Sequence, residues 1–227
     1  MIKQQTIPQD YKFAYVKNAR SVSSLVSSIQ VEFDPTGSKL RRAAKNQGLT
    51  TEDVQAQWNA KGSASRSLGS DLHEHIAGIL RNEEPDPIEV LSTQHPHIRV
   101  FNRFWKRASK NFQVVWVEKT IASQKYNITG RVDAMLFDSS TRQHHLIDWK
   151  SGKYSTHGWD SLLPPFDDMR SSSPDLGAVQ LGVYRLAVED ALNIELGRSY
   201  VGYVSDVGMT MRRVDDIGDR LERWLSG

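Results

Sequence analysis

Apolar residues recur at helical spacing through most of the first half of the chain. The strongest pattern is one stripe within residues 63–81, formed by Leu68, Leu72, Ile76, Ile79 and Leu80. Thr50 and Asp53 have the spacing of a capping arrangement, which satisfies free N–H groups where a helix begins. Pro96 suits the first turn of another helix. Helices are therefore predicted over residues 21–30, 37–46, 50–58, 63–81 and 96–110.

From residue 112 the pattern changes to runs rich in Val, Ile, Thr and aromatic residues, which favour strands. Three such runs predict a meander over residues 112–122, 126–137 and 143–150. A helix over 176–196, strands over 200–205 and 209–213, and a helix over 215–225 are predicted to follow. Helices, then a sheet, then further helices and strands predict a mixed α/β (α+β) fold. We expect an N-terminal helical segment, residues 1–62, packed on a core of residues 63–227.

Composition and charge limit the possible functions. Of the 227 residues, 38% are hydrophobic and 25% charged, which is typical of a soluble globular protein. The net charge of +2 is too small to indicate nucleic-acid binding by itself. The chain has no cysteine, which excludes disulfides, thiolate zinc sites and cysteine-ligated iron–sulfur clusters. No apolar run reaches the roughly 20 residues that span a bilayer, so no membrane partner is expected. The first residues have no signal-peptide core, which favours a cytoplasmic protein.

A charged pair interrupts the apolar strand predicted over residues 143–150. Side chains alternate along a strand, so Asp148 and Lys150 share one face, and Ile147 and Trp149 share the other. Burying such charges is costly unless a ligand or metal compensates. A hairpin would bring Asp133 alongside, and two carboxylates with an ammonium group can hold a divalent cation and polarise a phosphate ester. A surface ion pair is the alternative, and spacing alone leaves both open.

Two histidines on the helix over 63–81 are candidate ligands. On a helical wheel, His73 lies about 100° to one side of Leu72 and His75 about 60° to the other. Either ring can reach the edge of the core, so helix geometry does not choose between them. Gly69, one turn before His73, would let a strand or ligand approach closely. On the later helix, Gln180 and Tyr184 are four residues apart and share one face, as expected for a site or for an ordinary amphipathic helix.

Two further features concern a nucleic-acid substrate. A basic face is predicted on the helix over 96–110, formed by Arg99, Arg103, Lys106 and Lys110. Such a face is usually only solvated, but it could follow a phosphate backbone, with Phe104 or Trp116 stacking on bases. Residues 153–174 form a long polar loop, which in a compact domain favours a function. Its Trp159 and Phe166 would wall a substrate channel, or the loop is a disordered insertion.

Taken together, these residues resemble the RecB-like branch of the PD-(D/E)XK nuclease superfamily. The Asp-x-Lys element alone is weak, whereas the ordered set is specific. The set comprises Gly69 to His73, Glu118, Gly130 to Asp133, Asp148 to Lys150, and Gln180 with Tyr184. The resemblance implies a restriction-endonuclease-like core, a central mixed sheet flanked by helices. Residues 21–25 also resemble the start of phage-encoded members and of the mitochondrial genome maintenance exonuclease.

The resemblance also implies a role for each matching residue. The metal, Mg²⁺ or Mn²⁺, would be held by His73, Asp133, Asp148 and the backbone carbonyl of Trp149. Lys150 would orient or activate the attacking water, and Gln180 and Tyr184 would hold the metal-site residues or the scissile phosphate. Glu118 matches an acidic position at the edge of the catalytic site. The DNA-binding residues would be Arg99, Arg103, Lys106, Lys110, Arg131 and Lys153. An iron–sulfur cluster, which some relatives carry, is not expected.

The implied function is a metal-dependent deoxyribonuclease, an exonuclease on single-stranded DNA or DNA ends. A structure-specific endonuclease on the same core and a catalytically inactive DNA-binding module are the alternatives. DNA repair, recombination and phage genome processing all fit. The chain lacks the phosphate-binding loop of a helicase motor, so a replication or recombination protein would have to supply any translocation. The expected location is the cytoplasm of a bacterium or phage-infected cell rather than a mitochondrion.

Overall fold

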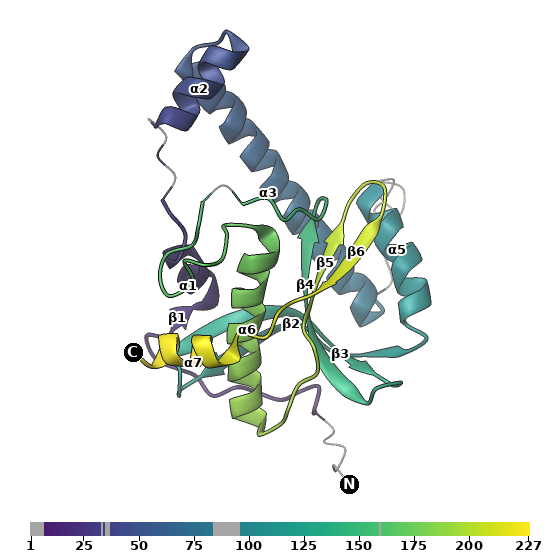
Figure 1. The fold of residues 1–227 in the computed structure, drawn as a ribbon. Coiled ribbons are helices and arrows are strands. Elements are labelled where there is room, and N and C mark those ends of the chain that lie inside the picture. The colour runs from purple at the N-terminus through teal and green to yellow at the C-terminus, as the bar shows by residue number, and fades with distance from the viewer. Residues whose placement is uncertain (1–6, 33, 35–36, 84–95, 159) are drawn as a thin grey trace.

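A six-stranded mixed sheet lies between two layers of helices in the computed structural model, which describes residues 7–32, 34, 37–83, 96–158 and 160–227 (Figure 1). The strands are β1 (Arg20–Ser21), β2 (Phe112–Ser123), β3 (Ile128–Asp138), β4 (Gln143–Ser151), β5 (Tyr200–Val204) and β6 (Met209–Arg213). The helices are α1 (Val22–Ser28), α2 (Ser38–Gln47), α3 (Thr51–Arg81), α5 (Pro96–Ala108), α6 (Ser173–Leu192) and α7 (Gly218–Ser226). The predicted mixed α/β core and the β2–β3–β4 meander are confirmed.

The two faces of the sheet are buried by separate apolar clusters. On one face α1, α6 and α7 pack on the sheet, and on the other α3 and α5 do so (Figure 1). Because side chains alternate along β4, Ile147 and Trp149 enter the α3–α5 layer, where they meet Leu72 and Phe101. Asp148 faces the opposite layer and is hydrogen-bonded by α6. The apolar residues of β4 therefore fix the direction of its charged ones.

One edge of β3 is left open between two neighbouring strands. On the edge away from β2, β1 pairs in parallel with Ile128 and Thr129, and β4 pairs antiparallel from Ala134 onward. Beyond Ile147, β4 leaves β3 and pairs only with β5. Residues 130–132 are consequently paired with β2 alone, and Asp133 has no partner in either register. This gap in the sheet contains the Gly130–Asp133 segment.

Several boundaries differ from the prediction, and the largest difference is in α3. Residues 50–58 and 63–81 belong to one continuous helix, α3, because the single Gly62 costs only about 1 kcal/mol and no proline interrupts the helix. The predicted boundary between residues 62 and 63 therefore lies inside α3. The helix α6 ends at Leu192 instead of 196, since Asn193 adopts a left-handed conformation (φ 49°) and caps it. The helix α7 begins at Gly218 instead of 215.

The helix α2 and the first half of α3 project away from the rest of the molecule (Figure 1). A small apolar cluster of Leu40, Ala44 and Val54 holds the two helices together. We call residues 38–66 the helical arm. The second half of α3 packs on the sheet, so one helix connects the tip of the arm to the core. None of the described helices is long and apolar enough to cross a membrane.

Candidate metal centre and catalytic site

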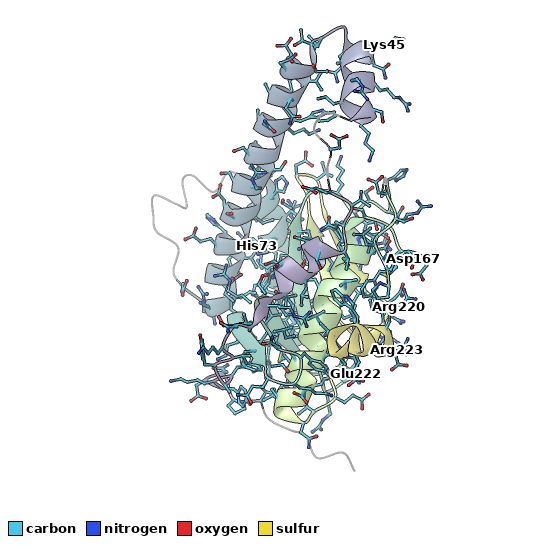
Figure 2. The ribbon with its side chains drawn as sticks, turned by 90° about the vertical axis from the view of Figure 1, so that its left-hand side faces the viewer. Lys45, His73, Asp167, Arg220, Glu222 and Arg223 are labelled. Atoms are coloured by element: carbon cyan, nitrogen blue, oxygen red, sulfur yellow. The ribbon has the colours of Figure 1, made fainter. Side chains whose placement is uncertain are left out.

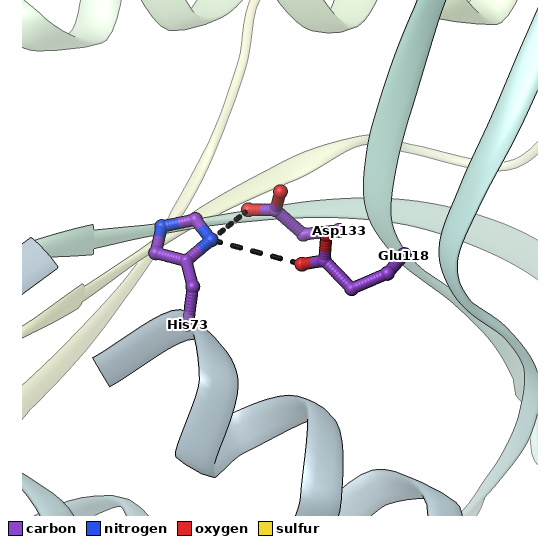
Figure 3. Close-up of side chains that lie close together, drawn as sticks. All are labelled: His73, Glu118 and Asp133. Atoms are coloured by element: carbon purple, nitrogen blue, oxygen red, sulfur yellow. Dashed lines mark ion pairs between the residues drawn. The ribbon is translucent and has the colours of Figure 1, made fainter. Parts of the chain in front are cut away.

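Three potential metal ligands meet where α3 crosses the gap in the sheet (Figure 3). Nδ1 of His73 lies 3.4 Å from Oδ2 of Asp133 and 3.9 Å from Oε1 of Glu118. One ligand atom from each residue lies within 4.8 Å of the other two. The side chains come from α3, β3 and β2 and are partly buried, so the group is accessible without being freely solvated. An imidazole with two carboxylates suits Mn²⁺ or Mg²⁺.

The two carboxylates strongly favour the charged form of His73. Burial disfavours the imidazolium ion, but the hydrogen bonds to Asp133 and Glu118 and the charge of Asp133 outweigh this effect and raise the pKa of His73 to about 10. The charge of Asp148 acts in the same direction. The imidazolium therefore balances negative charge at the place where a cation would bind.

The backbone of Glu118 is unusual for a residue in a strand. Its φ is 49°, in the left-handed region, which costs a residue with a Cβ roughly 1–2 kcal/mol. In this conformation one carboxylate oxygen approaches His73, and the other is 2.7 Å from Nε of Arg131. The resemblance placed Glu118 at the edge of the site. The structure places it within the group of potential ligands, and strand periodicity gives no signal for this.

Asp148 belongs to a second polar group, next to the first. Its Oδ1 accepts hydrogen bonds from Lys150 Nζ at 3.1 Å and from Gln180 Nε2 at 3.0 Å, and Oε1 of Gln180 accepts one from Lys150 at 3.3 Å. Asp148 is only 2% exposed. Its Oδ2 is 2.8 Å from Lys150 Nζ but is not in hydrogen-bond geometry with it. This buried, incompletely satisfied oxygen fits a further metal ligand.

Burial and neighbouring charges set the protonation of this second group. Burial raises the pKa of Asp148 to about 6; Lys150 opposes the shift, and the carboxylate of Asp133 adds to it. Burial alone would lower the pKa of Lys150, but the charges of Asp148 and Asp133 raise it. Lys150 is accordingly an ammonium ion that can donate hydrogen bonds and offset negative charge.

Backbone and aromatic contacts join the two groups. Oδ2 of Asp133 accepts a hydrogen bond from the backbone N–H of Trp149 at 2.7 Å, across the gap where β3 and β4 separate. Gly130 lies against the Tyr184 ring, and a Cβ on Gly130 would come 2.6 Å from Cε1 of that ring. Burial raises the pKa of Tyr184 to about 12, so its hydroxyl keeps its proton. The glycine thus lets α6 approach β3 closely.

The remaining described residues that the sequence analysis proposed are not part of the two polar groups. His75 lies outside the group, with Nδ1 3.2 Å from the backbone oxygen of Asp71. The basic residues of α5 are exposed, as is Lys153. Two expectations are wrong: Trp116 is 3% exposed and cannot stack on bases, and Phe166 is fully buried against Trp224. Trp159 lies outside the described residues.

Comparison with known protein families identifies one superfamily for this chain. A family model described as the PD-(D/E)XK nuclease superfamily matches residues 89–225. Among curated proteins, none matches the sequence. One solved structure to which the chain is similar is described as "Crystal structure of SSO0001", with 14% identity, 94% of this chain and 74% of that chain covered, and a TM-score of 0.38. The matched family range contains Glu118, Asp133, Asp148, Lys150, Gln180 and Tyr184 but not His73.

Proposed function

Because the chain belongs to the PD-(D/E)XK nuclease superfamily, we propose that it is a divalent-metal-dependent deoxyribonuclease of the RecB-like branch. It would hydrolyse phosphodiester bonds as an exonuclease on single-stranded DNA or DNA ends. The observation that carries this proposal is the meeting of His73, Glu118 and Asp133 beside the buried Asp148 and Lys150. Potential metal ligands and a paired ammonium ion at one gap in the sheet are the parts that phosphodiester hydrolysis needs.

In this proposal the metal ligands and the Lys150 group have different roles. Mg²⁺ or Mn²⁺ would be held by His73, Asp133, Asp148 and the backbone carbonyl of Trp149, with Glu118 as a further ligand. The bound ion would lower the pKa of a water molecule and stabilise negative charge on the phosphate. Lys150 would orient that water and offset the same charge. Gln180 would keep Asp148 and Lys150 in position, and Tyr184 would donate a hydrogen bond from its neutral hydroxyl.

Several finer statements belong to the proposal as well. Arg99, Arg103, Lys106, Lys110, Arg131 and Lys153 would contact DNA. We further propose a cytoplasmic role in repair, recombination or phage genome processing, with a replication or recombination protein as partner. A structure-specific endonuclease would use the same site, so the products must separate the two activities.

The proposal is tested with end-labelled linear single- and double-stranded DNA in Mg²⁺ or Mn²⁺, alongside a circular single-stranded substrate. We expect progressive shortening of linear DNA, an intact circle, and no cleavage in chelator. Lys150→Ala should lower kcat at least about 100-fold, since it removes a cation that acts on the developing charge. Its thermal unfolding should show that the fold is kept. Cleavage of the circle would replace the exonuclease by an endonuclease, and a fully active Lys150→Ala protein would contradict the mechanism.

A further inference from the structure

Positive charge is concentrated in the helical arm. Residues 38–66 contain six lysines and arginines and only two acidic residues, whereas the whole chain carries a net charge of +2. The rest of the chain therefore has a net charge of −2. The two acids, Glu52 and Asp53, lie in the first turn of α3, where Asp53 completes a capping box with Thr50. The arm thus presents a basic surface on a molecule that is otherwise slightly acidic.

The basic residues of α2 point away from its packed side. Leu40 and Ala44 are buried against α3, and Arg41, Arg42 and Lys45 are exposed. Among the described residues, the side chains of these three cations form no ion pair and no hydrogen bond. Lys39 differs, because its Nζ is 2.8 Å from Asp160 and ties the arm to the loop between β4 and α6. Free, exposed cations next to one another are available to a polyanion.

A second feature connects the arm to the metal centre. Gly62, Arg66, Gly69 and His73 follow at steps of four, three and four, so they lie along one face of α3. Arg66 is exposed, and its Nη1 lies over Gly62, 3.4 Å from where a Cβ would be. Gly62 and Gly69 are partly buried and carry no side chain, and a Cβ on Gly69 would lie 3.6 Å from Oγ of Ser151. We call these four residues the α3 stripe, which leads from the arm to His73.

The length of α3 sets the reach of this surface. Between Thr51 and His73 the helix axis rises by about 33 Å, at roughly 1.5 Å per residue. Figure 2 shows Lys45 at the far end of the arm and His73 where α3 reaches the core. A DNA strand that is stacked as in a duplex has one phosphate per roughly 3.4 Å, so for such a strand this span corresponds to about ten nucleotides.

We propose that the helical arm and the α3 stripe bind the phosphodiester backbone of DNA on one side of the scissile bond, over up to about ten nucleotides. This inference rests on the proposed deoxyribonuclease function and deepens it. It makes the arm an electrostatic guide that holds the substrate strand, while the chemistry takes place at the gap in the sheet. Cleavage efficiency should therefore depend on substrate length up to the reach of the arm.

The test compares single-stranded DNA substrates of 4 to 24 nucleotides by kcat/KM. The arm variant is Arg41→Glu with Lys45→Glu, and the matched control is Lys12→Glu with Lys17→Glu. Lys12 and Lys17 are also exposed, but they lie in the N-terminal segment, where Tyr11 and Phe13 pack on Trp116 of β2. Both variants make the same change in charge. Thermal unfolding is measured for each. Any shift should be small, because all four side chains are exposed and only Lys45 lies in the last turn of a helix, where its positive charge is favourable.

For the wild type and the control we expect kcat/KM to rise with length and level off near ten nucleotides. The arm variant should have the same kcat/KM as the wild type on the shortest substrate, and its kcat/KM should not rise with substrate length. On long substrates the slope of log kcat/KM against log salt concentration should be shallower for the arm variant than for the wild type. The expected difference is about 1.4, because each of the two lost phosphate contacts contributes about 0.7 on a single strand. An arm variant that follows the wild-type length series overturns the inference. An arm variant whose kcat/KM falls by the same factor on short and long substrates also overturns the inference.

Equilibrium binding separates this inference from the proposed function. The same DNA length series is bound to Lys150→Ala protein, with and without the two arm substitutions. If the wild type cleaves no DNA but DNA binding still depends on substrate length and on Arg41 and Lys45, the proposed nuclease function is wrong. The inference that the arm binds DNA is then still supported. If binding depends on neither length nor the arm residues, the inference is wrong even for an active nuclease.

Discussion

At the scale of single residues, the site is built from charges that stabilise one another. The two carboxylates that hold His73 in its charged form are also the oxygen ligands that a metal would need. Asp148 has a raised pKa because it is buried, and Lys150 and Gln180 occupy only part of its hydrogen-bonding capacity. A bound cation would balance the same carboxylates, and His73 would then contribute its neutral imidazole as a ligand.

The first prediction distinguishes the two histidines that the helical wheel left open. His73→Ala should weaken Mn²⁺ binding at least about tenfold, because it removes a ligand nitrogen next to Asp133 and Glu118. His75→Ala is the matched control and should leave binding unchanged, since its ring bonds the backbone of its own helix. Calorimetric titration of both proteins measures the difference. Weakened binding in the His75 variant alone would contradict the assignment.

At the scale of elements, the gap on β3 explains why the site lies where it does. Strands β3 and β4 are joined by a tight turn at one end and separate at the other end. There the side chain of Asp133 accepts a hydrogen bond from the backbone N–H of Trp149. The turn fixes the register and so brings Asp133 next to β4. Asp138 organises this turn by accepting hydrogen bonds from Ser140 and Thr141.

The second prediction concerns the stability of this turn. Burial opposes ionisation of Asp138, but the bonds from Ser140 and Thr141 outweigh it and lower its pKa. Stability from Asp138 is therefore present above its unfolded pKa of about 3.9 and is lost as the pH falls through the lower folded value. Asp138→Ala should cost about 2 kcal/mol at pH 7, from urea unfolding, and less at pH 3. Asp206→Ala, at an exposed turn position, is the control; an equal cost in both would refute the role of the turn.

At the scale of the whole molecule, the potential metal ligands come from parts of the chain that are far apart in sequence. His73 comes from α3, outside the matched family range, and Glu118, Asp133 and Asp148 come from the sheet within that range. The same helix continues into the arm. A metal bound by these residues would therefore connect the N-terminal helices with the core.

The third prediction follows from this connection. A metal that binds only the folded chain, at about 100 times its dissociation constant, should add about 2.7 kcal/mol to the free energy of unfolding. For a chain of this length the expected rise in Tm is roughly 5–10 °C. Thermal unfolding in Mn²⁺ and in chelator measures it, and His73→Ala should show a much smaller rise. An identical Tm with and without Mn²⁺ would count against a metal centre.

The local pattern of the sequence was enough to predict most of the elements and the chemically important residues. Periods of 3.6 and 2 residues are local, so they predict the two halves of α3, most of α6 and the β2–β3–β4 meander without knowledge of contacts. Charged residues within apolar strands, such as Asp148 and Lys150, are equally visible. The placement of Trp116 and Phe166 was wrong because burial depends on distant partners, Pro8 for one and Trp224 for the other.

Only the tertiary structure decided which of these residues meet. The docking of α3 on the sheet brings His73, and not His75, to Asp133, and the left-handed backbone of Glu118 turns its carboxylate toward them. The open edge of β3 depends on where β1 ends and β4 begins to pair, which no local pattern encodes. Local periodicity fixes which face of a helix or strand a side chain takes. Proximity between distant segments arises only when helices and strands pack.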